Sequence, residues 1–157
     1  MSRPQLISLP SLLLVGAALW LSSLFAAPLA THLGFFGAPL LYAIFDPLCH
    51  QIAERSFHFW GEPLAVCHRC AGLYSGVALG LLLWPRLHRS RALLLERGRW
   101  ILLFFAPMAI DVALPWNTEW TRFTTGCIAS FPVALLLLVA VEQLSIDQLR
   151  LAPRREQ

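Results

Sequence analysis

Four side chains that bind soft metal ions occur in two short groups of the sequence. Cys49 and His50 are adjacent, and a C-x-x-C pair, Cys67 and Cys70, follows at a spacing typical of structural zinc sites. Because two such pairs can complete a tetrahedral shell, the sequence predicts a metal site, with zinc as the candidate ion, formed by Cys49, His50, Cys67 and Cys70. Adjacent residues rarely both bind one ion, so His68 is an alternative to His50 as the fourth ligand.

The same cysteines also allow redox chemistry. In an oxidising compartment thiols form disulfides, and a cation such as Arg69 lowers a thiol pKa within a C-x-x-C pair. Cys49 would then exchange with Cys67 or Cys70, and a quinone in the membrane is a conceivable electron acceptor. A third interpretation treats the thiols as ordinary buried side chains. Cys127 fits either scheme or is simply a small core residue.

Asp111 is the other chemically informative residue, because it lies in an apolar stretch. A carboxylate at membrane depth costs several kcal/mol unless it is paired, and Arg122 is its predicted partner. Asp111 and Arg122 are therefore the candidate catalytic residues, or alternatively a structural pair that fixes two helices. Other polar or small residues that we expect beside them in one pocket are Glu54, Arg55, Thr125 and Gly126.

The composition places these residues in a membrane protein. Of the 157 residues, 57% are hydrophobic and 13% are charged, whereas soluble domains carry about 25% charge. A membrane-spanning helix needs about 20 apolar residues. Four stretches meet or approach this length: about 6–27, 64–84, 100–116 and 123–144. We expect an all-α polytopic membrane protein with a single membrane domain, 1–157, in which 28–63 is an outer re-entrant or interfacial segment.

Two of these helices are predicted to end at prolines, Pro28 and Pro85, since proline cannot continue a helix. The first stretch also resembles a cleaved signal peptide, because Arg3 precedes it and small residues follow it. Its apolar run approaches 20 residues, however, and exceeds the about 7 to 15 residues of a signal sequence. We therefore expect a helix that is retained.

The placement of the arginines predicts the orientation. All twelve basic residues are arginine, and nine of them lie at Arg3, between Arg86 and Arg99, and in the tail from Arg150 to Arg155. Arginine-rich short loops stay on the cytoplasmic side. The loop 85–99 and both termini are therefore expected in the cytoplasm of a cell (inner) membrane protein, and the cysteine groups at the outer face.

The predicted helix over 64–84 has two faces of different character. At about 100° per residue, one face carries Cys67, Cys70 and Tyr74, and the opposite face carries Gly72, Gly76 and Gly80. Small residues at this spacing allow close helix–helix association. The glycine stripe is thus a predicted packing surface, and the cysteine face is left to meet the segment around Cys49.

Other function classes lack their motifs. The sequence contains no H-E-x-x-H, G-x-S-x-G, P-loop or dinucleotide fingerprint. The short basic loop is explained by topology, so the expected partner is the lipid bilayer and not nucleic acid. No substrate follows from these residues, and they leave open whether the protein is an enzyme. Metal-assisted hydrolysis with Asp111 as base is a third and weaker hypothesis.

A set of short motifs resembles a family of small, uncharacterised prokaryotic membrane proteins, the domain of unknown function 2085 type. The motifs, which extend over roughly Asp46 to Gly126, are Cys49-His50-Gln51, Glu54-Arg55-Ser56-Phe57, Cys67-x-Arg69-Cys70-x-Gly72-x-Tyr74-x-Gly76, Pro107-Met108-x-Ile110-Asp111 and Arg122-Phe123-x-Thr125-Gly126. The resemblance implies a role for these residues and no particular reaction. The expected function is a membrane protein with a Cys/His metal cluster at its outer face; the alternative is a thiol-disulfide oxidoreductase.

Overall fold

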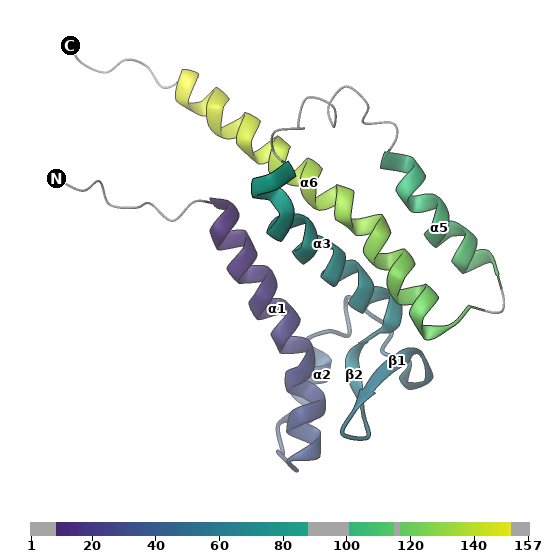
Figure 1. Ribbon diagram of the computed structural model, residues 1–157. Helices are drawn as coiled ribbons and strands as arrows, with labels where there is room; N and C mark the ends of the chain where they lie inside the picture. The colour runs from purple at the N-terminus through teal and green to yellow at the C-terminus, as the bar shows by residue number, and fades with distance from the viewer. Residues whose placement is uncertain (1–8, 88–100, 115–116, 152–157) are drawn as a thin grey trace.

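Four apolar helices and a small hairpin make up the fold. In the computed structural model the described residues are 9–87, 101–114 and 117–151. The elements are α1 (Leu9–His32), α2 (Ala38–Ala43), the 3-10 turn η1 (Ala53–Arg55), β1 (Ser56–Phe59), β2 (Glu62–Cys67), α3 (His68–Leu87), α5 (Ile101–Ala113) and α6 (Glu119–Leu151). The four longer helices alternate in direction, and α3 lies between α1 and α6 while α5 packs on α6 (Figure 1).

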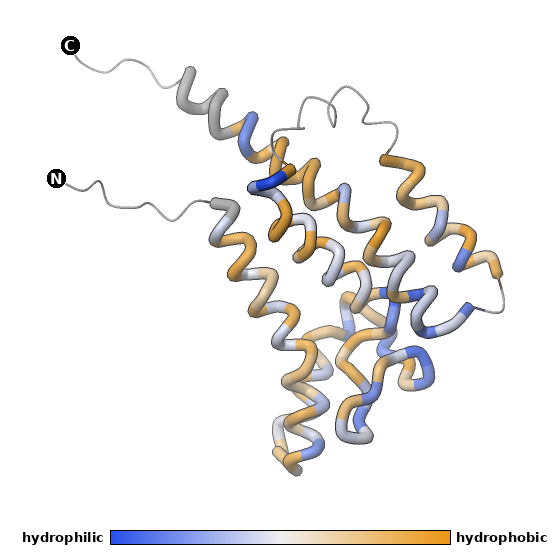
Figure 2. Tube along the Cα trace, viewed as in Figure 1, coloured by the Kyte–Doolittle hydropathy of each residue, from blue (hydrophilic) through white to orange (hydrophobic). Residues whose placement is uncertain are grey.

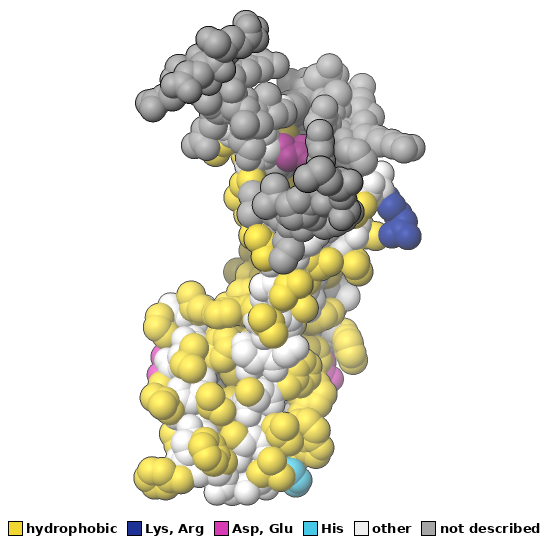
Figure 3. Space-filling view, turned by 90° about the vertical axis from the view of Figure 1, so that its left-hand side faces the viewer, with side chains coloured by type: hydrophobic (Ala, Val, Ile, Leu, Met, Phe, Trp, Pro, Cys, Tyr) yellow, Lys and Arg dark blue, Asp and Glu magenta, His cyan; other side chains and the backbone are white. Residues whose placement is uncertain are grey.

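Three of the helices are long and apolar enough to cross a membrane, over Ser11–His32, His68–Leu87 and Glu119–Leu144. The shorter α5 has 13 residues and extends about 20 Å, less than the about 30 Å of a bilayer core. Apolar residues dominate the helices, and hydrophilic residues gather near the hairpin (Figure 2). Hydrophobic side chains also cover much of the face that α1 contributes (Figure 3). The expectation of a mostly helical, polytopic membrane protein is confirmed.

Several helix ends differ from the predicted ones. Pro28 and Pro85 lie inside α1 and α3, which continue to His32 and Leu87. In an apolar environment, continuing the helix keeps more backbone groups hydrogen-bonded than ending it would. The second helix begins at His68, four residues later than predicted, because the preceding residues pair with β1 as a strand.

The hairpin is formed by β1 and β2, which pair antiparallel with Phe59 opposite Glu62. The two residues between them, Trp60 and Gly61, both have positive φ, at 55° and 86°. Such a two-residue turn matches the twist of the strands it joins, and glycine adopts it without steric cost. The Tyr42 hydroxyl donates a hydrogen bond of 2.7 Å to the carbonyl of Pro63, which fixes β2 against the end of α2.

The contact between α3 and α6 is a backbone-to-backbone packing. A side chain on Gly72 would collide with the carbonyl of Phe123, and one on Gly76 would collide with the backbone of Cys127. Gly126 on α6 lies equally close to the backbone of Arg69. Glycines therefore allow these helices to approach more closely than any side chain would permit, and they hold the start of α3 in one place.

The apolar core has two parts. One lies where α1, the Cys49 segment and β2 meet, and its buried residues are Leu24, Ala27, Phe45, Cys49, Leu64, Ala65, Val66 and Ala71. The other lies farther along α3 and α6 and contains Leu81, Trp84, Leu135, Leu138 and Val139. In the first part the Trp20 ring packs edge-on against Phe45 and Tyr74, with ring centroids 5.2 and 5.7 Å apart. This part of the core supports the chemically interesting residues.

Most of the arginines used to predict the orientation lie outside the described residues or side chains: Arg3, Arg89, Arg91, Arg97, Arg99, Arg150, Arg154 and Arg155. The predicted boundaries at Trp100 and Trp116 lie outside them too. Within the described part, α1 begins and α3 and α6 end at one end of the bundle, and the hairpin lies at the other (Figure 1).

Candidate functional site

Three cysteine thiols form a cluster at the hairpin end of the bundle. The Sγ atoms of Cys49, Cys67 and Cys70 all lie within 4.8 Å of one another. Cys49 follows α2, Cys67 is the last residue of β2, and Cys70 is in the first turn of α3. The backbone N–H of Cys67 donates to the Cys49 sulfur over 3.2 Å. The cluster therefore joins three separate pieces of backbone.

The position of Cys49 is determined by its local backbone. Its N–H donates to the carbonyl of Phe45 over 2.9 Å, and its side chain is only 5% exposed. Two residues later Gln51 adopts a positive φ of 48°, and its side-chain amide donates to the Tyr42 carbonyl over 2.6 Å. The segment thus folds back on α2 and presents the Cys49 thiol to the start of α3.

Cys67 lies where a strand passes directly into a helix. A hydrogen bond from the Cys70 thiol is the largest of the effects that lower its pKa, from 9.0 to about 5; the backbone N–H groups of Cys70 and Arg69 and the Cys49 thiol add to it, and burial opposes it. Backbone N–H groups at the start of a helix favour an anion in this way. These hydrogen bonds favour the thiolate of Cys67, which is the form that binds metals and attacks disulfides.

The cluster is suited to a thiophilic metal ion. Zinc binds thiolates at about 2.3 Å, so sulfurs that share one tetrahedral ion lie about 3.8 Å apart. The three Sγ atoms, all within 4.8 Å of one another, need to move by about 1 Å at most to reach that spacing. The N–H donor at Cys49 and the anionic Cys67 suit coordinating sulfurs, which need hydrogen bonds to carry their charge. The group is thus near enough to bind a metal.

The two candidate histidines differ. His50 is exposed and lines the same pocket as the thiols, although its nitrogens are not within the 4.8 Å group. His68 is buried against the ring of Phe57, at a centroid distance of 4.4 Å, and its Nε2 lies 3.6 Å from the Glu119 carboxylate. His68 therefore belongs to the packing between β1, α3 and α6, and His50 is the better placed of the two for the cluster.

The sequence analysis predicted that Cys67 and Cys70 lie on one face of a helix. In the structure they do not belong to the same helix. Cys67 belongs to β2, so the strand-to-helix junction, and not helical periodicity, brings the two thiols together. Tyr74, one turn after Cys70 on α3, packs beside the ring of Trp20 on the same core cluster as Cys67 and Cys70. Cys127 lies on α6 against the glycines of α3, outside the thiol cluster.

A pocket of about 600 Å³ opens beside the thiols. Its lining comes from the Cys49 segment, η1, the β2–α3 junction and the α5–α6 connection. The lining residues are Leu48, Cys49, His50, Ile52, Arg55, Cys67, Arg69, Cys70, Val112, Leu114, Asn117 and Arg122. Of the expected pocket residues, Arg55 and Arg122 line it; Glu54, Thr125 and Gly126 do not. The Thr125 hydroxyl instead donates to the carbonyl of Thr121 in its own helix, over 2.7 Å.

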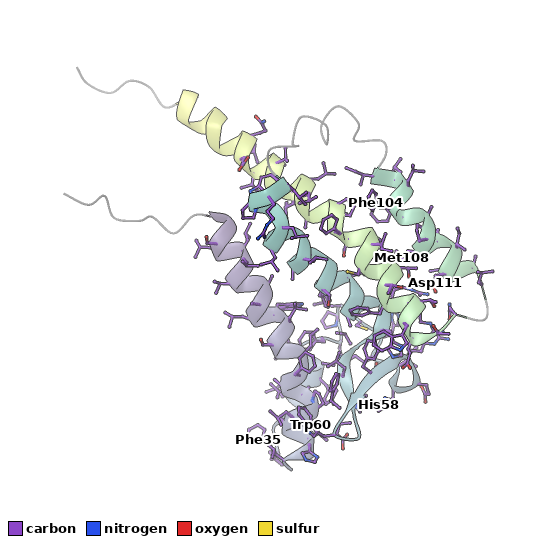
Figure 4. The ribbon with its side chains drawn as sticks, viewed as in Figure 1. Phe35, His58, Trp60, Phe104, Met108 and Asp111 are labelled. Carbon is purple, nitrogen blue, oxygen red and sulfur yellow. The ribbon has the colours of Figure 1, made fainter. Side chains whose placement is uncertain are left out.

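The predicted pairing of Asp111 with Arg122 is wrong. Asp111 is 6% exposed, lies on the part of α5 nearest the hairpin end (Figure 4), and accepts a hydrogen bond of 2.6 Å from Nη2 of Arg69. The carboxylate reaches α3 because α5 packs beside the close α3–α6 contact. Sequence reasoning noted Arg69 only as a cation beside the C-x-x-C pair, and no local signal relates α3 to α5.

Arg122 is held by Asn117, a residue that sequence analysis did not single out for the site. The Asn117 side-chain oxygen accepts hydrogen bonds from Nε of Arg122, over 2.8 Å, and from its Nη2. The amide nitrogen of Asn117 donates to the backbone carbonyl of Asp111 over 2.6 Å. Asn117 therefore ties the end of α5 to α6 and orients the Arg122 guanidinium at the pocket wall.

Comparisons with known proteins agree with this description. Residues 49–136 match the family described as "Predicted membrane protein (DUF2085)". An uncharacterized protein of Methanocaldococcus jannaschii is 31% identical over 138 residues, which cover 81% of this chain and 88% of that relative. An uncharacterized protein of Methanothermobacter thermautotrophicus is 32% identical over 103 residues, which cover 60% of this chain and 88% of that relative.

No solved structure matches the chain. The family match begins at Cys49 and includes the thiol cluster, Asp111 and Arg122. It covers more than half of the 157 residues. The chain therefore belongs to the DUF2085 family of membrane proteins.

Proposed function

We propose that this membrane protein binds a zinc ion through Cys49, Cys67 and Cys70. The observation that carries the proposal is the convergence of three thiols, from three separate pieces of backbone, within 4.8 Å. Thiolates select soft ions, and three sulfurs with one further ligand are a common zinc shell. The N–H donor at Cys49 supports a negatively charged sulfur there.

His50 is the proposed fourth ligand. Its ring lines the pocket that the three thiols face, and it is exposed, so no packing contact has to be broken for it to turn inward. Cys₃His sites are common in structural zinc centres. With His50 bound, the ion would tie the segment after α2 to the start of α3.

We place the zinc site at the outer face of the cell membrane, with both termini in the cytoplasm, in a single membrane domain. The arginine-rich stretches of the sequence support this orientation. The arrangement of the described helices is compatible with it, because the hairpin lies at the end of the bundle away from the start of α1 and the end of α6.

Metal analysis of the purified full-length protein tests the proposal. We expect about one equivalent of zinc per chain, and a loss of most of it in Cys49→Ser, Cys67→Ser and Cys70→Ser. Cys127→Ser is the matched control, since this cysteine lies apart from the cluster. Zinc contents that are equal in Cys70→Ser and Cys127→Ser would contradict the proposal. A smaller loss in His50→Ala than in the cysteine variants would be consistent with a ligand that water can replace.

A thiol-disulfide oxidoreductase is the second candidate, and the environment of Cys67 favours it. The Cys67 thiolate would attack a disulfide of a client protein, form a mixed disulfide and release one client thiolate, which takes a proton from water. The Cys70 thiol would then lose its proton to water and attack the Cys67 sulfur of the mixed disulfide, so that the second client sulfur leaves as a thiolate and a Cys67–Cys70 disulfide forms. Two electrons pass to the client, and a cation beside the pair suits this chemistry.

Trapping of the mixed disulfide distinguishes the two functions. In the double variant Cys49→Ala/Cys70→Ala both thiols that could resolve the mixed disulfide are absent, so a redox enzyme accumulates adducts through Cys67 that a reductant releases. A zinc protein accumulates none and loses its metal instead.

Of the two catalytic candidates, Arg122 lines the pocket, and we assign Asp111 a positioning role through Arg69.

A further inference from the structure

Three arginine side chains converge on the pocket beside the thiols. Arg55 comes from η1, Arg69 from the first turn of α3, and Arg122 from the first turn of α6. No aspartate or glutamate is among the described residues that line this pocket. A site walled by guanidinium groups from three different elements has a positive potential directed into one cavity.

Two of the three guanidinium groups are already oriented. Arg69 is held by Asp111 and Arg122 by Asn117, through the hydrogen bonds described above. The Nε of Arg69 is buried and has no hydrogen-bond partner among the described residues. An arginine that is fixed before a ligand arrives loses little freedom on binding, so these two contribute to affinity at low entropic cost.

The charge in the pocket exceeds what the protein neutralises. Among the described residues, the carboxylate ion pairs are Arg69 with Asp111 and His68 with Glu119. Arg55 and Arg122 therefore have no carboxylate within 4.0 Å in this part of the chain. Arg55 and Arg122 are left to face an anion, in addition to the free edge of Arg69, and a thiolate at Cys67 in the same lining offsets only part of their positive charge.

Besides the arginines, the thiols, His50 and Asn117, the pocket has four apolar lining residues. Leu48 and Ile52 line the pocket from the segment around Cys49, and Val112 and Leu114 from the end of α5. The pocket lies beside the first turns of two membrane-spanning helices, α3 and α6. At about 600 Å³ it exceeds the size of one small inorganic anion and falls within the range of sites for small organic molecules.

We propose that this pocket binds a phosphate group, contacted by Arg55, Arg69 and Arg122. Guanidinium groups donate paired hydrogen bonds to phosphate oxygens, and a phosphate presents enough oxygens for several of them at once, whereas one carboxylate is satisfied by a single fork. The apolar side of the pocket would accommodate the remainder of a phosphate ester. The proposal goes beyond metal binding and does not depend on it, because arginines carry the recognition.

Two sources of phosphate are open to such a site: a free phosphate and the headgroup of an anionic lipid. Isothermal titration of the purified full-length protein with inorganic phosphate, in a maltoside detergent and a phosphate-free buffer, tests the first. Titration of the protein in the same detergent with mixed micelles that contain phosphatidic acid or, as the comparison, phosphatidylcholine tests the second. The zinc content of each preparation is measured in parallel, so that the two proposals can fail separately.

Arg55→Gln is the decisive variant. The side chain of Arg55 is exposed, so its substitution leaves the core intact. Arg86→Gln is the matched control, because it removes the same charge from the opposite end of α3. We expect Arg55→Gln to raise the dissociation constant about tenfold or more, and Arg86→Gln to leave it unchanged. Arg55→Lys should give an intermediate value, since it keeps the charge and loses the fork.

The outcomes separate clearly. Binding of inorganic phosphate that Arg55→Gln weakens supports the proposal with free phosphate as the ligand. Binding of phosphatidic acid in mixed micelles that Arg55→Gln abolishes, without binding of inorganic phosphate, supports it with a lipid headgroup as the ligand. Absence of both kinds of binding in the wild type overturns it. Equal weakening by Arg55→Gln and Arg86→Gln also overturns it, because the attraction would then be a general effect of charge.

Discussion

Nη2 of Arg69 donates to the carboxylate of Asp111 over 2.6 Å, across 42 positions of the sequence. This ion pair connects α3 with α5, a helix that otherwise packs on α6. Arg69 is adjacent to Cys70, so the same pair that holds α5 also fixes a residue beside the thiol cluster. The position of α5 and the position of the residue next to Cys70 thus depend on the same ion pair.

Asp111→Asn should destabilise the protein. The substitution keeps the shape of the side chain and leaves the Arg69 charge without its counterion in a largely buried position. Loss of one partner of a buried ion pair costs about 3 kcal/mol or more. Chemical unfolding in detergent, followed by the helical signal in circular dichroism, measures this free energy.

A double substitution provides the control for the ion pair. Arg69→Met together with Asp111→Leu removes both charges and keeps apolar volume, so it should unfold less easily than Asp111→Asn alone. The double variant is compared with the single variants Arg69→Met and Asp111→Leu. If its loss of unfolding free energy equals the sum of their two losses, the side chains do not interact energetically, and the ion pair has no stabilising role.

Gly76→Ala should separate α3 from α6. An added methyl group would collide with the backbone of Cys127 and the hydroxyl of Ser130, and overpacking of this kind costs about 1 to 3 kcal/mol. Gly16→Ala is the matched control, since nothing lies within 4 Å of a side chain at Gly16. Thermal unfolding in detergent should show a lower transition temperature for the first variant only. A Gly76→Ala variant as stable as Gly16→Ala would be inconsistent with the close helix contact.

In the metal-free protein, the reactivity of Cys67 should depend on pH in an unusual range. Its pKa of about 5 keeps it anionic above pH 5, whereas an ordinary cysteine, with a pKa of about 8.5, is mostly protonated below pH 8. The rate of alkylation of Cys67, followed by mass spectrometry of its peptide, should therefore reach half its maximum near pH 5 and its maximum by pH 7. A midpoint near pH 8.5 would mean that the hydrogen bonds to Cys67 are not maintained.

Removal of the metal should loosen the segment around Cys49. This segment is held by its backbone bond to Phe45, by Gln51, by the N–H of Cys67 and by the proposed zinc–sulfur bond, so a chelator would remove one of these restraints. Hydrogen exchange over residues 46–52 should become about tenfold faster or more, and zinc should reverse the change. Exchange over residues 76–84 of α3 should not respond. A response of both regions would indicate general unfolding instead.

The helices were predictable because long apolar stretches have few alternatives in a membrane. The hairpin was missed, although its signal is present in the sequence: short runs rich in aromatic and apolar residues flank Trp60 and Gly61. The apolar residues of β2 merged with those of α3 into one hydrophobic stretch. Composition alone could not show where the strand ended and the helix began.

The site was predictable in part for a related reason. Residue types and spacing were sufficient to single out Cys49, Cys67 and Cys70. The partner of Asp111 was not predictable, because both Arg69 and Arg122 lie near it, and the choice depends on how three helices pack. In the structure the guanidinium of Arg122 donates to the side-chain oxygen of Asn117, and the carboxylate of Asp111 pairs with Arg69.

The glycine contacts between α3 and α6 have a consequence for how the pocket can open. Where Gly72, Gly76 and Gly126 bring the two backbones together, few side chains lie between the helices, so this part of α3 and α6 moves as one rigid unit that carries Cys70, Arg69 and Arg122 together. α5, which contributes Val112 and Leu114 to the pocket, is attached from outside this unit. If the pocket widens, the elements that can move are therefore α5 and the Cys49 segment, and rupture of the Arg69–Asp111 pair is the step that would release α5.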